Sequence, residues 1–257
     1  MHYYFVATSL SPLSLKVEPE NSFAEIKDDF KMNLSLQDLK SVHALLEPID
    51  LYNVKALWLG EPLDERGTIL GKELEEALLV RESLPEYVSD FLDSHDSDEE
   101  RLRYFPSLVS SMYAQKREGF LGEYFTFERE VACILSALRA KKLRKDLIQV
   151  FQFEDPTDPF IAQILAQKDG PEYVPPAEYE DLKTLFVENE QEPEKLADAL
   201  AMYRFEKFGE WESREHFTMD RILAYAARLL LVEDTLSLSE KERQEAINII
   251  ESLSEYG

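Results

Sequence analysis

The chain has 257 residues and a formal net charge of −24, because 52 aspartate and glutamate side chains outnumber 28 lysine and arginine side chains. This charge excludes nucleic acids and anionic lipid surfaces as expected partners, since both are polyanions. With 44% hydrophobic residues and only 8 glycines, the composition is not that of a disordered chain, and it favours helices joined by short connections.

Residues 1–33 leave two alternatives open. Tyr3-Tyr4-Phe5-Val6 has the propensity of a short extended strand, whereas the Ser-Leu-Ser-Pro that follows marks a turn. No lysine or arginine precedes this apolar stretch, which argues against a secretory signal. No uncharged apolar run approaches the ~20 residues of a membrane helix, so we expect a cytoplasmic protein without direct membrane insertion.

From Ser35 onward the spacing of apolar residues becomes helical. Ser35 and Asp38 predict a capping pair at the start of one helix, and a second short helix is predicted over Leu51–Leu59, ended by Gly60. Further helices are predicted over Lys72–Arg81 and from Pro85. The charged run that ends in Ser97-Asp98-Glu99-Glu100 is typical of a capped helix start and lacks the glycine and ligand spacing of a calcium loop.

Two stretches resemble each other, each after a Met-Tyr pair: Glu123–Arg129 and Glu215–Arg221. The shared motif comprises Phe125, Thr126, Glu128 and Arg129 in the first copy, and Phe217, Thr218, Asp220 and Arg221 in the second. Such a repeat indicates a duplicated helical unit. We expect each threonine to cap a helix, each acid to cap it or face its dipole, and each arginine to pair with the sister copy. A contact surface shared by both copies is the alternative.

Five prolines between residues 156 and 176 predict a junction between the two copies. The expected organisation is an N-terminal helical region over 1–105, a first copy over 106–155, the junction, and a second copy with a terminal helix over 177–257. In the last segment a helix is predicted from Pro193, and Ser239 with Glu242 predicts a cap for a separate terminal helix whose packing face holds Ile247, Ile250 and Leu253. The fold class is therefore all-α, built from helical hairpins.

Catalytic, cofactor-binding and metal-binding motifs are absent from the sequence. There is no glycine-rich phosphate loop and no serine nucleophile elbow, and the four histidines are scattered. Cys133 lies in an apolar helical run and is interpreted as a core residue, which also fits a reducing compartment. A non-enzyme with no cofactor and no metal is expected, and a hydrolase that uses two carboxylates is the alternative.

One basic cluster interrupts the acidic chain. It consists of Arg139, Lys141, Lys142, Arg144 and Lys145. The cations suit a helix C-terminus, where the dipole favours positive charge by ~0.3–1 kcal/mol each. The alternative is a docking patch for an acidic partner, since the second copy reads Leu-Leu-Val-Glu-Asp at the corresponding place.

Several segments along nearly the whole chain resemble a bacterial family of unknown function whose genes lie in operons for V-type (V/A-type) ATPases. These segments are Tyr3–Ala7, Asp64–Gly67, Leu84–Tyr87, Phe125–Leu135 and His216–Tyr225, of which the last is the most specific. Leu10-Ser11-Pro12 departs from the Leu-Pro usual in that family, which affects the local turn only.

This resemblance implies a stand-in for the C subunit (d in eukaryotes), the non-catalytic helical funnel that couples the central stalk of the ATPase to its membrane rotor ring. The expected partners are therefore other V-type ATPase subunits, and the expected location is cytoplasmic and peripheral to the membrane complex. An acidic helical adaptor or assembly chaperone for the same complex is the alternative. The C subunit consists of three similar helical units, whereas two copies of such a unit are identified in this sequence.

Overall fold

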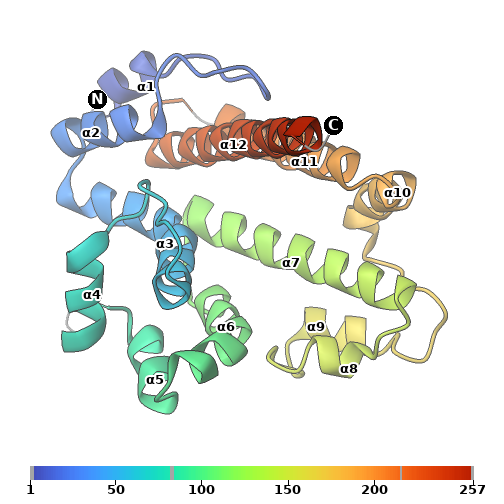
Figure 1. Ribbon diagram of the computed structural model, residues 1–257. Helices are drawn as coiled ribbons and strands as arrows, with labels where there is room; N and C mark the ends of the chain where they lie inside the picture. The colour runs from blue at the N-terminus through green and yellow to red at the C-terminus, as the bar shows by residue number, and fades with distance from the viewer. Residues whose placement is uncertain (1–2, 82–83, 215, 256–257) are drawn as a thin grey trace. The chain divides into compact units, whose positions relative to one another are not determined.

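The computed structural model describes the backbone of residues 3–81, 84–214 and 216–255, and side chains as far as Leu238. Over these residues it contains twelve α-helices, one short 3-10 helix and no strand, which confirms the all-α prediction (Figure 1). The helices are α1 (Tyr4–Ser9), α2 (Phe23–Asn33), α3 (Leu36–Leu59), α4 (Gly71–Val80), α5 (Glu86–Ser94), α6 (Asp98–Tyr113), α7 (Gly119–Lys142), α8 (Leu147–Val150), α9 (Pro159–Leu165), η1 (Ala177–Tyr179), α10 (Glu180–Asn189), α11 (Pro193–Arg214) and α12 (Met219–Glu255).

The chain divides into two compact units. Unit 1 comprises Met1–Leu39 and Glu188–Gly257, and unit 2 comprises Lys40–Val187. The division falls inside α3 and inside α10. It therefore differs from the four segments expected from the sequence, and the proline-rich stretch 156–176 lies within unit 2.

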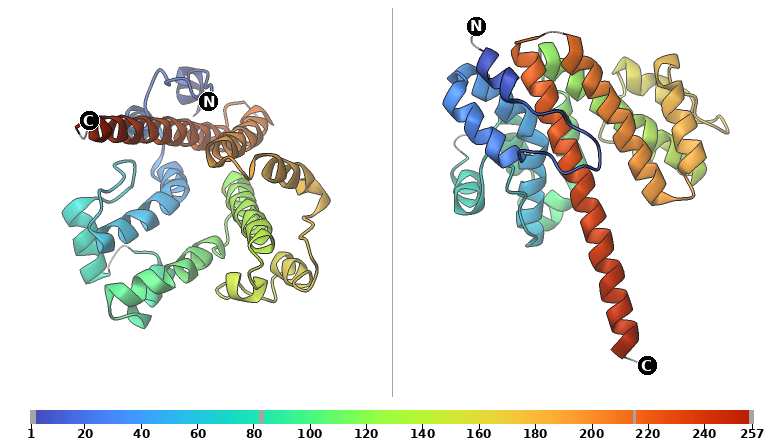
Figure 2. Two further views of the ribbon diagram at one scale, coloured as in Figure 1. Left: turned by 45° about the vertical axis from the view of Figure 1, so that its right-hand side comes forward. Right: turned by 90° about the horizontal axis from the view of Figure 1, so that it is seen from above.

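Unit 1 is built on a helical hairpin. Helices α11 and α12 lie side by side, and α1 and α2 pack against α12 (Figure 2). Phe23 and Phe30 of α2 and Ile222 and Leu229 of α12 are fully buried, so an apolar face of each helix contributes to the core. The backbone N–H of Phe23 also donates to Glu233 Oε1 at 2.6 Å, which fixes the start of α2 to α12.

The N-terminal residues form a helix where β-propensity favoured a strand. Val6 and Ala7 of α1 are buried in unit 1, so tertiary packing overrides the local preference of Tyr3-Tyr4-Phe5-Val6. A loop over residues 10–22, with a turn at Lys16, follows and ends at Ser22, whose side chain and that of Glu25 form a reciprocal capping box.

Helix α3 confirms one prediction and corrects another. Ser35 Oγ accepts the backbone N–H of Asp38 at 3.2 Å, and the Asp38 carboxylate accepts the backbone N–H of Ser35 at 3.3 Å, as the capping pattern predicted. The separate helix expected over Leu51–Leu59 is instead the second half of α3, with Pro48 inside it. Gly60 ends the helix at φ +69°, a left-handed conformation that glycine adopts without strain.

The next predicted helices correspond to α4 and α5. Pro85 occupies the N-cap of α5, whereas the first helical position was expected for it. At the start of α6, the Ser97 hydroxyl accepts the backbone N–H of Glu100 at 3.2 Å. Pro106, where the first copy was expected to begin, lies inside α6.

One core cluster of unit 2 is formed by α3, α5, α6 and α7. Its buried members are Leu51, Val88, Phe91, Leu92, Phe105, Leu108, Met112 and Phe125. Cys133 of α7 is also buried, and this burial raises the pKa of its thiol to about 12, so the core interpretation is confirmed.

Helix α12 corrects the prediction of a separate terminal helix. It runs without a break from Met219 to Glu255, so the backbone does not begin a new helix near Ser239. The predicted cap of Ser239 with Glu242, and the predicted face of Ile247, Ile250 and Leu253, lie outside the described side chains.

Candidate docking surface

The basic cluster lies at the C-terminal end of α7. Arg139, Lys141 and Lys142 occupy the last turn, and Arg144 has φ +53° just beyond it. The Lys141 side chain is fully used: its Nζ donates to the carbonyl oxygens of Gln167 (2.7 Å), Lys168 (2.6 Å) and Gly170 (2.7 Å). Lys141 thus holds the loop after α9 and is not available for docking, while docking by Arg139, Lys142, Arg144 and Lys145 stays a prediction.

The first copy of the repeated motif lies in the interior of α7. Phe125 is only 3% exposed and belongs to the core of unit 2. The prediction that Thr126 caps a helix is wrong, because α7 begins earlier, at Gly119. Arg129 pairs with Glu154 at 2.8 Å and with Asp158 at 3.2 Å, so its predicted pairing with the sister copy is also wrong.

The second copy lies at the start of α12. Phe217 has φ +63° and is 45% exposed. Thr218 Oγ1 accepts the N–H of Arg221 at 3.3 Å and Asp220 lies in the first turn, which confirms the cap and dipole predictions for this copy. Arg221 contacts His216, with 3.3 Å between its Nη1 and Nδ1 of the ring, and its pairing with the first copy stays a prediction. Glu215 lies outside the described residues.

The two copies differ because the helices before them end at different points. Tyr113 of the first Met-Tyr pair is the last residue of α6, whereas Tyr203 of the second pair lies inside α11, which continues to Arg214. The first copy therefore lies in the middle of a helix, whereas the second copy spans the start of a helix. Its phenylalanine is buried in the first setting and exposed in the second.

Exposed aromatic side chains of α1 adjoin the second copy of the motif in unit 1. The rings of Tyr4 and Phe217 have their centroids 5.1 Å apart, and those of Phe217 and His216 are 6.4 Å apart. Tyr4 is 59% exposed and its neighbour Phe5 is 65% exposed. We name this surface the aromatic patch, defined as Tyr4, Phe5, His216, Phe217 and Arg221.

The orientation of α1 is unusual for a helix that serves packing alone. Its small residues Val6 and Ala7 are buried, while the larger Tyr4 and Phe5 face solvent. Phe217 keeps a left-handed backbone that costs a residue with a Cβ about 1–2 kcal/mol. Exposed aromatic groups are enriched at protein interfaces, where burial of each ring stabilises the complex by about 1.5–3 kcal/mol. The aromatic patch is therefore the candidate docking surface.

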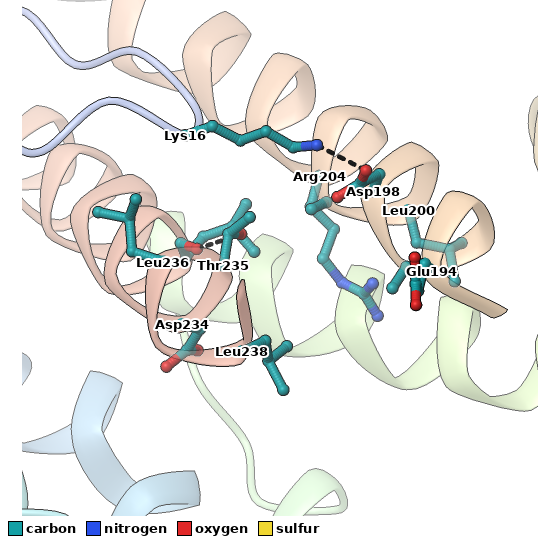
Figure 3. A pocket seen from close by; sticks show the side chains of 12 residues that line it. Lys16, Glu194, Asp198, Leu200, Arg204, Asp234, Thr235, Leu236 and Leu238 are labelled. Carbon is teal, nitrogen blue, oxygen red and sulfur yellow. Dashed lines mark hydrogen bonds and ion pairs between the residues drawn. The ribbon is translucent and has the colours of Figure 1, made fainter. Parts of the chain in front are cut away.

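A groove of about 530 Å³ lies on another part of unit 1, between α11 and α12 (Figure 3). Lys16 reaches from the loop after α1 to Asp198 of α11, with 2.5 Å between Nζ and Oδ2. Its lining combines apolar side chains such as Leu200 and Leu231 with charged side chains of both signs. This mixture offers no single chemistry for a ligand, and an exposed ion pair such as Lys16–Asp198 stabilises by only about 0–1 kcal/mol.

A second cavity, of about 550 Å³, lies in unit 2 between α3, α4 and α5 and is lined by three carboxylates, Glu47, Asp50 and the exposed Glu73. Glu47 accepts from Tyr87 Oη at 2.7 Å and from Arg117 Nη2 at 2.5 Å. Asp50 accepts the backbone N–H and the hydroxyl of Thr68, each at 2.6 Å. Burial, followed by the charge of Glu47, raises the pKa of Tyr87. The partners of Glu47 and Asp50 engage both oxygens of each of these two carboxylates, so these two side chains serve structure.

Neither a metal-binding cluster nor a membrane-spanning helix occurs among the residues that the structure describes. Among them, no three histidine, cysteine, aspartate or glutamate side chains gather in a way that could hold a metal ion. Within the same residues, no helix is both long and apolar enough to span a bilayer.

A protein family matches almost the entire chain. Residues 1–255 match the family described as "Protein of unknown function (DUF2764)". The chain belongs to this family. Similar proteins from Chlamydia muridarum, Chlamydia trachomatis and Chlamydia pneumoniae, each described as an uncharacterized protein, are 31%, 29% and 30% identical to this family member. The alignments cover 96–97% of this chain and 97% of each relative. No solved structure matches the chain.

Proposed function

We propose that this protein is a non-catalytic component of a V-type ATPase that couples the central stalk to the membrane rotor ring, and that it binds a neighbouring subunit through the aromatic patch. The proposal is carried by one observation. Two segments on which the resemblance to the ATPase-operon family depends, Tyr3–Ala7 and His216–Tyr225, meet in unit 1 and expose their aromatic rings there.

The energetics of the patch support a binding role. Tyr4, Phe5 and Phe217 expose apolar surface to water, and Phe217 does so from a strained backbone. A partner that covers these rings would recover the hydrophobic free energy that the isolated chain leaves unused. Tyrosine and arginine, both present in the patch, are also among the residues whose truncation most often weakens a protein complex strongly.

The second candidate, an acidic helical adaptor or assembly chaperone for the same complex, is favoured by a different observation. A coupling subunit built from duplicated helical units would place its repeated motif in equivalent backbone, whereas Phe125 lies inside a helix and Phe217 precedes one. An adaptor does not require such equivalence. The adaptor predicts that the protein is recovered in less than one copy per purified complex.

Affinity purification of the native V-type ATPase, with quantitative counting of subunits, tests both candidates. A coupling component should be recovered in a fixed ratio to the stalk subunits, and its deletion should abolish ATP-driven ion pumping. Phe217→Gly and Tyr4→Ala should each reduce this recovery, whereas Met202→Ala, at a residue that is also 45% exposed, should not. Absence of the protein from the complex, together with normal pumping in the deletion strain, would rule out both roles.

A further inference from the structure

Arg221 lies at the edge of the aromatic patch without a carboxylate partner among the described residues. Its Nη1 lies 3.3 Å from Nδ1 of His216, and its Nε–H is shielded from solvent and has no acceptor there. A guanidinium stays protonated at neutral pH and offers five N–H donors. Most of the hydrogen-bonding capacity of Arg221 is therefore unused within the described part of the chain.

Three other partly buried arginines have a carboxylate partner within the chain. Each of them holds a glutamate: Arg117 pairs with Glu47 at 2.5 Å, Arg129 with Glu154 at 2.8 Å, and Arg228 with Glu212 at 2.5 Å. The chain has 52 carboxylates for 28 basic side chains, so acids are not scarce. Among the described residues, no carboxylate takes the corresponding place beside Arg221.

We infer that the aromatic patch binds a segment of a partner protein in which a large apolar side chain stands next to a carboxylate. The apolar side chain packs on the rings of Tyr4 and Phe217, whose centroids are 5.1 Å apart, and the carboxylate accepts two N–H bonds from Arg221. This inference rests on the proposed function, because it names what the proposed docking surface recognises.

Because of the net charge of the chain, the salt dependence of binding distinguishes an acidic partner segment from a basic one. A basic segment would be attracted by the overall charge of −24, and salt would weaken its binding. An acidic segment is repelled at long range and held by contact at short range. Added salt should therefore leave its affinity unchanged or raise it.

Peptide display against the full-length protein tests the inference even while the partner is unidentified. A random peptide library should yield binders that combine a large apolar residue with Asp or Glu. The synthetic form of the strongest binder is then titrated by calorimetry against the wild-type protein and its variants. Arg221→Gln should weaken binding about tenfold or more, and so should replacement of the peptide carboxylate by its amide.

A double-mutant cycle confirms that the two groups touch. With Arg221→Gln and the amide peptide combined, the loss should be well below the product of the two single losses, because one contact is removed twice. The controls are Arg103→Gln, at an exposed arginine paired with Glu99, and Met202→Ala, and both should retain wild-type affinity. Circular dichroism and thermal unfolding verify that every variant is folded.

Two results would overturn the inference: binders dominated by Lys and Arg, or binders whose affinity is independent of Arg221. A different result would contradict the proposed function alone. If acidic peptides bind through Arg221 while the purified ATPase lacks this protein, the recognition chemistry stands and the assignment to the ATPase falls.

Discussion

Phe217 holds a position that folding alone does not favour. A left-handed backbone costs a residue with a Cβ about 1–2 kcal/mol, and the ring contact with Tyr4 returns about 0.5–1.5 kcal/mol. The two terms nearly cancel. The contact with Tyr4 therefore only offsets the backbone cost, and the exposed 45% of the side chain adds nothing to the stability of the isolated chain, which agrees with a role in binding.

Substitution of Phe217 separates backbone strain from ring contacts. We expect Phe217→Gly to change the free energy of unfolding by less than about 1 kcal/mol, because glycine adopts φ +63° without strain. Phe217→Ala loses the ring and keeps the strain, so it should be the less stable of the two. Urea denaturation of both variants measures the difference, and a glycine variant less stable than the alanine variant would contradict strain at this position.

The ion pair between Arg117 and Glu47 leads to a second prediction at this scale. Their side chains are 8% and 18% exposed, so Arg117→Met should lower the free energy of unfolding by about 3–5 kcal/mol by leaving the Glu47 carboxylate without its cation. Adding Glu47→Gln should restore part of this loss. The matched control is Arg103→Met at the exposed pair with Glu99, which should cost less than about 1 kcal/mol. Equal losses in urea denaturation at the two sites would argue against burial as the cause.

At the scale of helices, boundaries with a local chemical signal were predictable from the sequence. Ser35, Ser97 and Gly60 act within a few residues of themselves, so their caps and stops could be read directly. Helix boundaries that are set by long-range packing could not be predicted from the sequence. Helix α1 exists because Val6 and Ala7 are buried in unit 1, and α3 continues through Pro48 although proline commonly breaks helices.

The candidate site was predictable only in part. The second motif copy was singled out, and its cap at Thr218 was predicted correctly. The exposure of Phe217 was not predictable, because it depends on where α11 ends and not on the motif, which buries Phe125 elsewhere. No local signal marked Tyr4 as its neighbour, since the two are far apart in sequence and meet only when α1 packs on α12.

Glu130 of α7 makes a polar contact with η1, the short 3-10 helix that follows the proline-rich stretch. Tyr179 Oη donates to Glu130 at 2.5 Å, and burial raises the pKa of this carboxyl above its ordinary value of 4.5. The folded chain therefore binds this proton more tightly than the unfolded chain does, so the contribution of Glu130 to stability falls as pH rises through the window above 4.5.

The variant Glu130→Gln removes this pH dependence and keeps an acceptor for Tyr179. It should be more stable than the wild type near neutral pH. The advantage should vanish at acidic pH, where the wild-type carboxyl is protonated in both states. Thermal unfolding of both proteins across this pH range measures the effect, and an advantage that grows on acidification would show that the sign is wrong.

Lys141 at the end of the same helix provides a prediction about a loop. Lys141→Ala removes the donor to three carbonyl oxygens and should lower the free energy of unfolding by about 1–3 kcal/mol. Amide hydrogen exchange should become faster in residues 167–170. The control Lys145→Ala, at an exposed side chain, should stay within about 0.5 kcal/mol of the wild type. If the two variants behave alike, the lysine does not hold this loop.

At the scale of the whole molecule, the charge of −24 acts against the folded state through self-repulsion. Between about 0.1 M and 1 M NaCl the Debye length falls from about 10 Å to about 3 Å, so repulsion between exposed carboxylates is screened. The melting temperature measured by circular dichroism should therefore rise by a few degrees over this range. A fall would instead show that salt-sensitive ion pairs outweigh the repulsion.

The division into two units has a practical consequence for optical experiments. The chain has two tryptophans, and each unit holds one of them: Trp211, stacked on Phe208 at 5.7 Å, in unit 1, and Trp58, packed against the core, in unit 2. Replacing either by phenylalanine leaves indole emission from a single unit. Intrinsic fluorescence of the two single-tryptophan proteins would then report which half of the molecule responds when a ligand is added or when denaturant first takes effect.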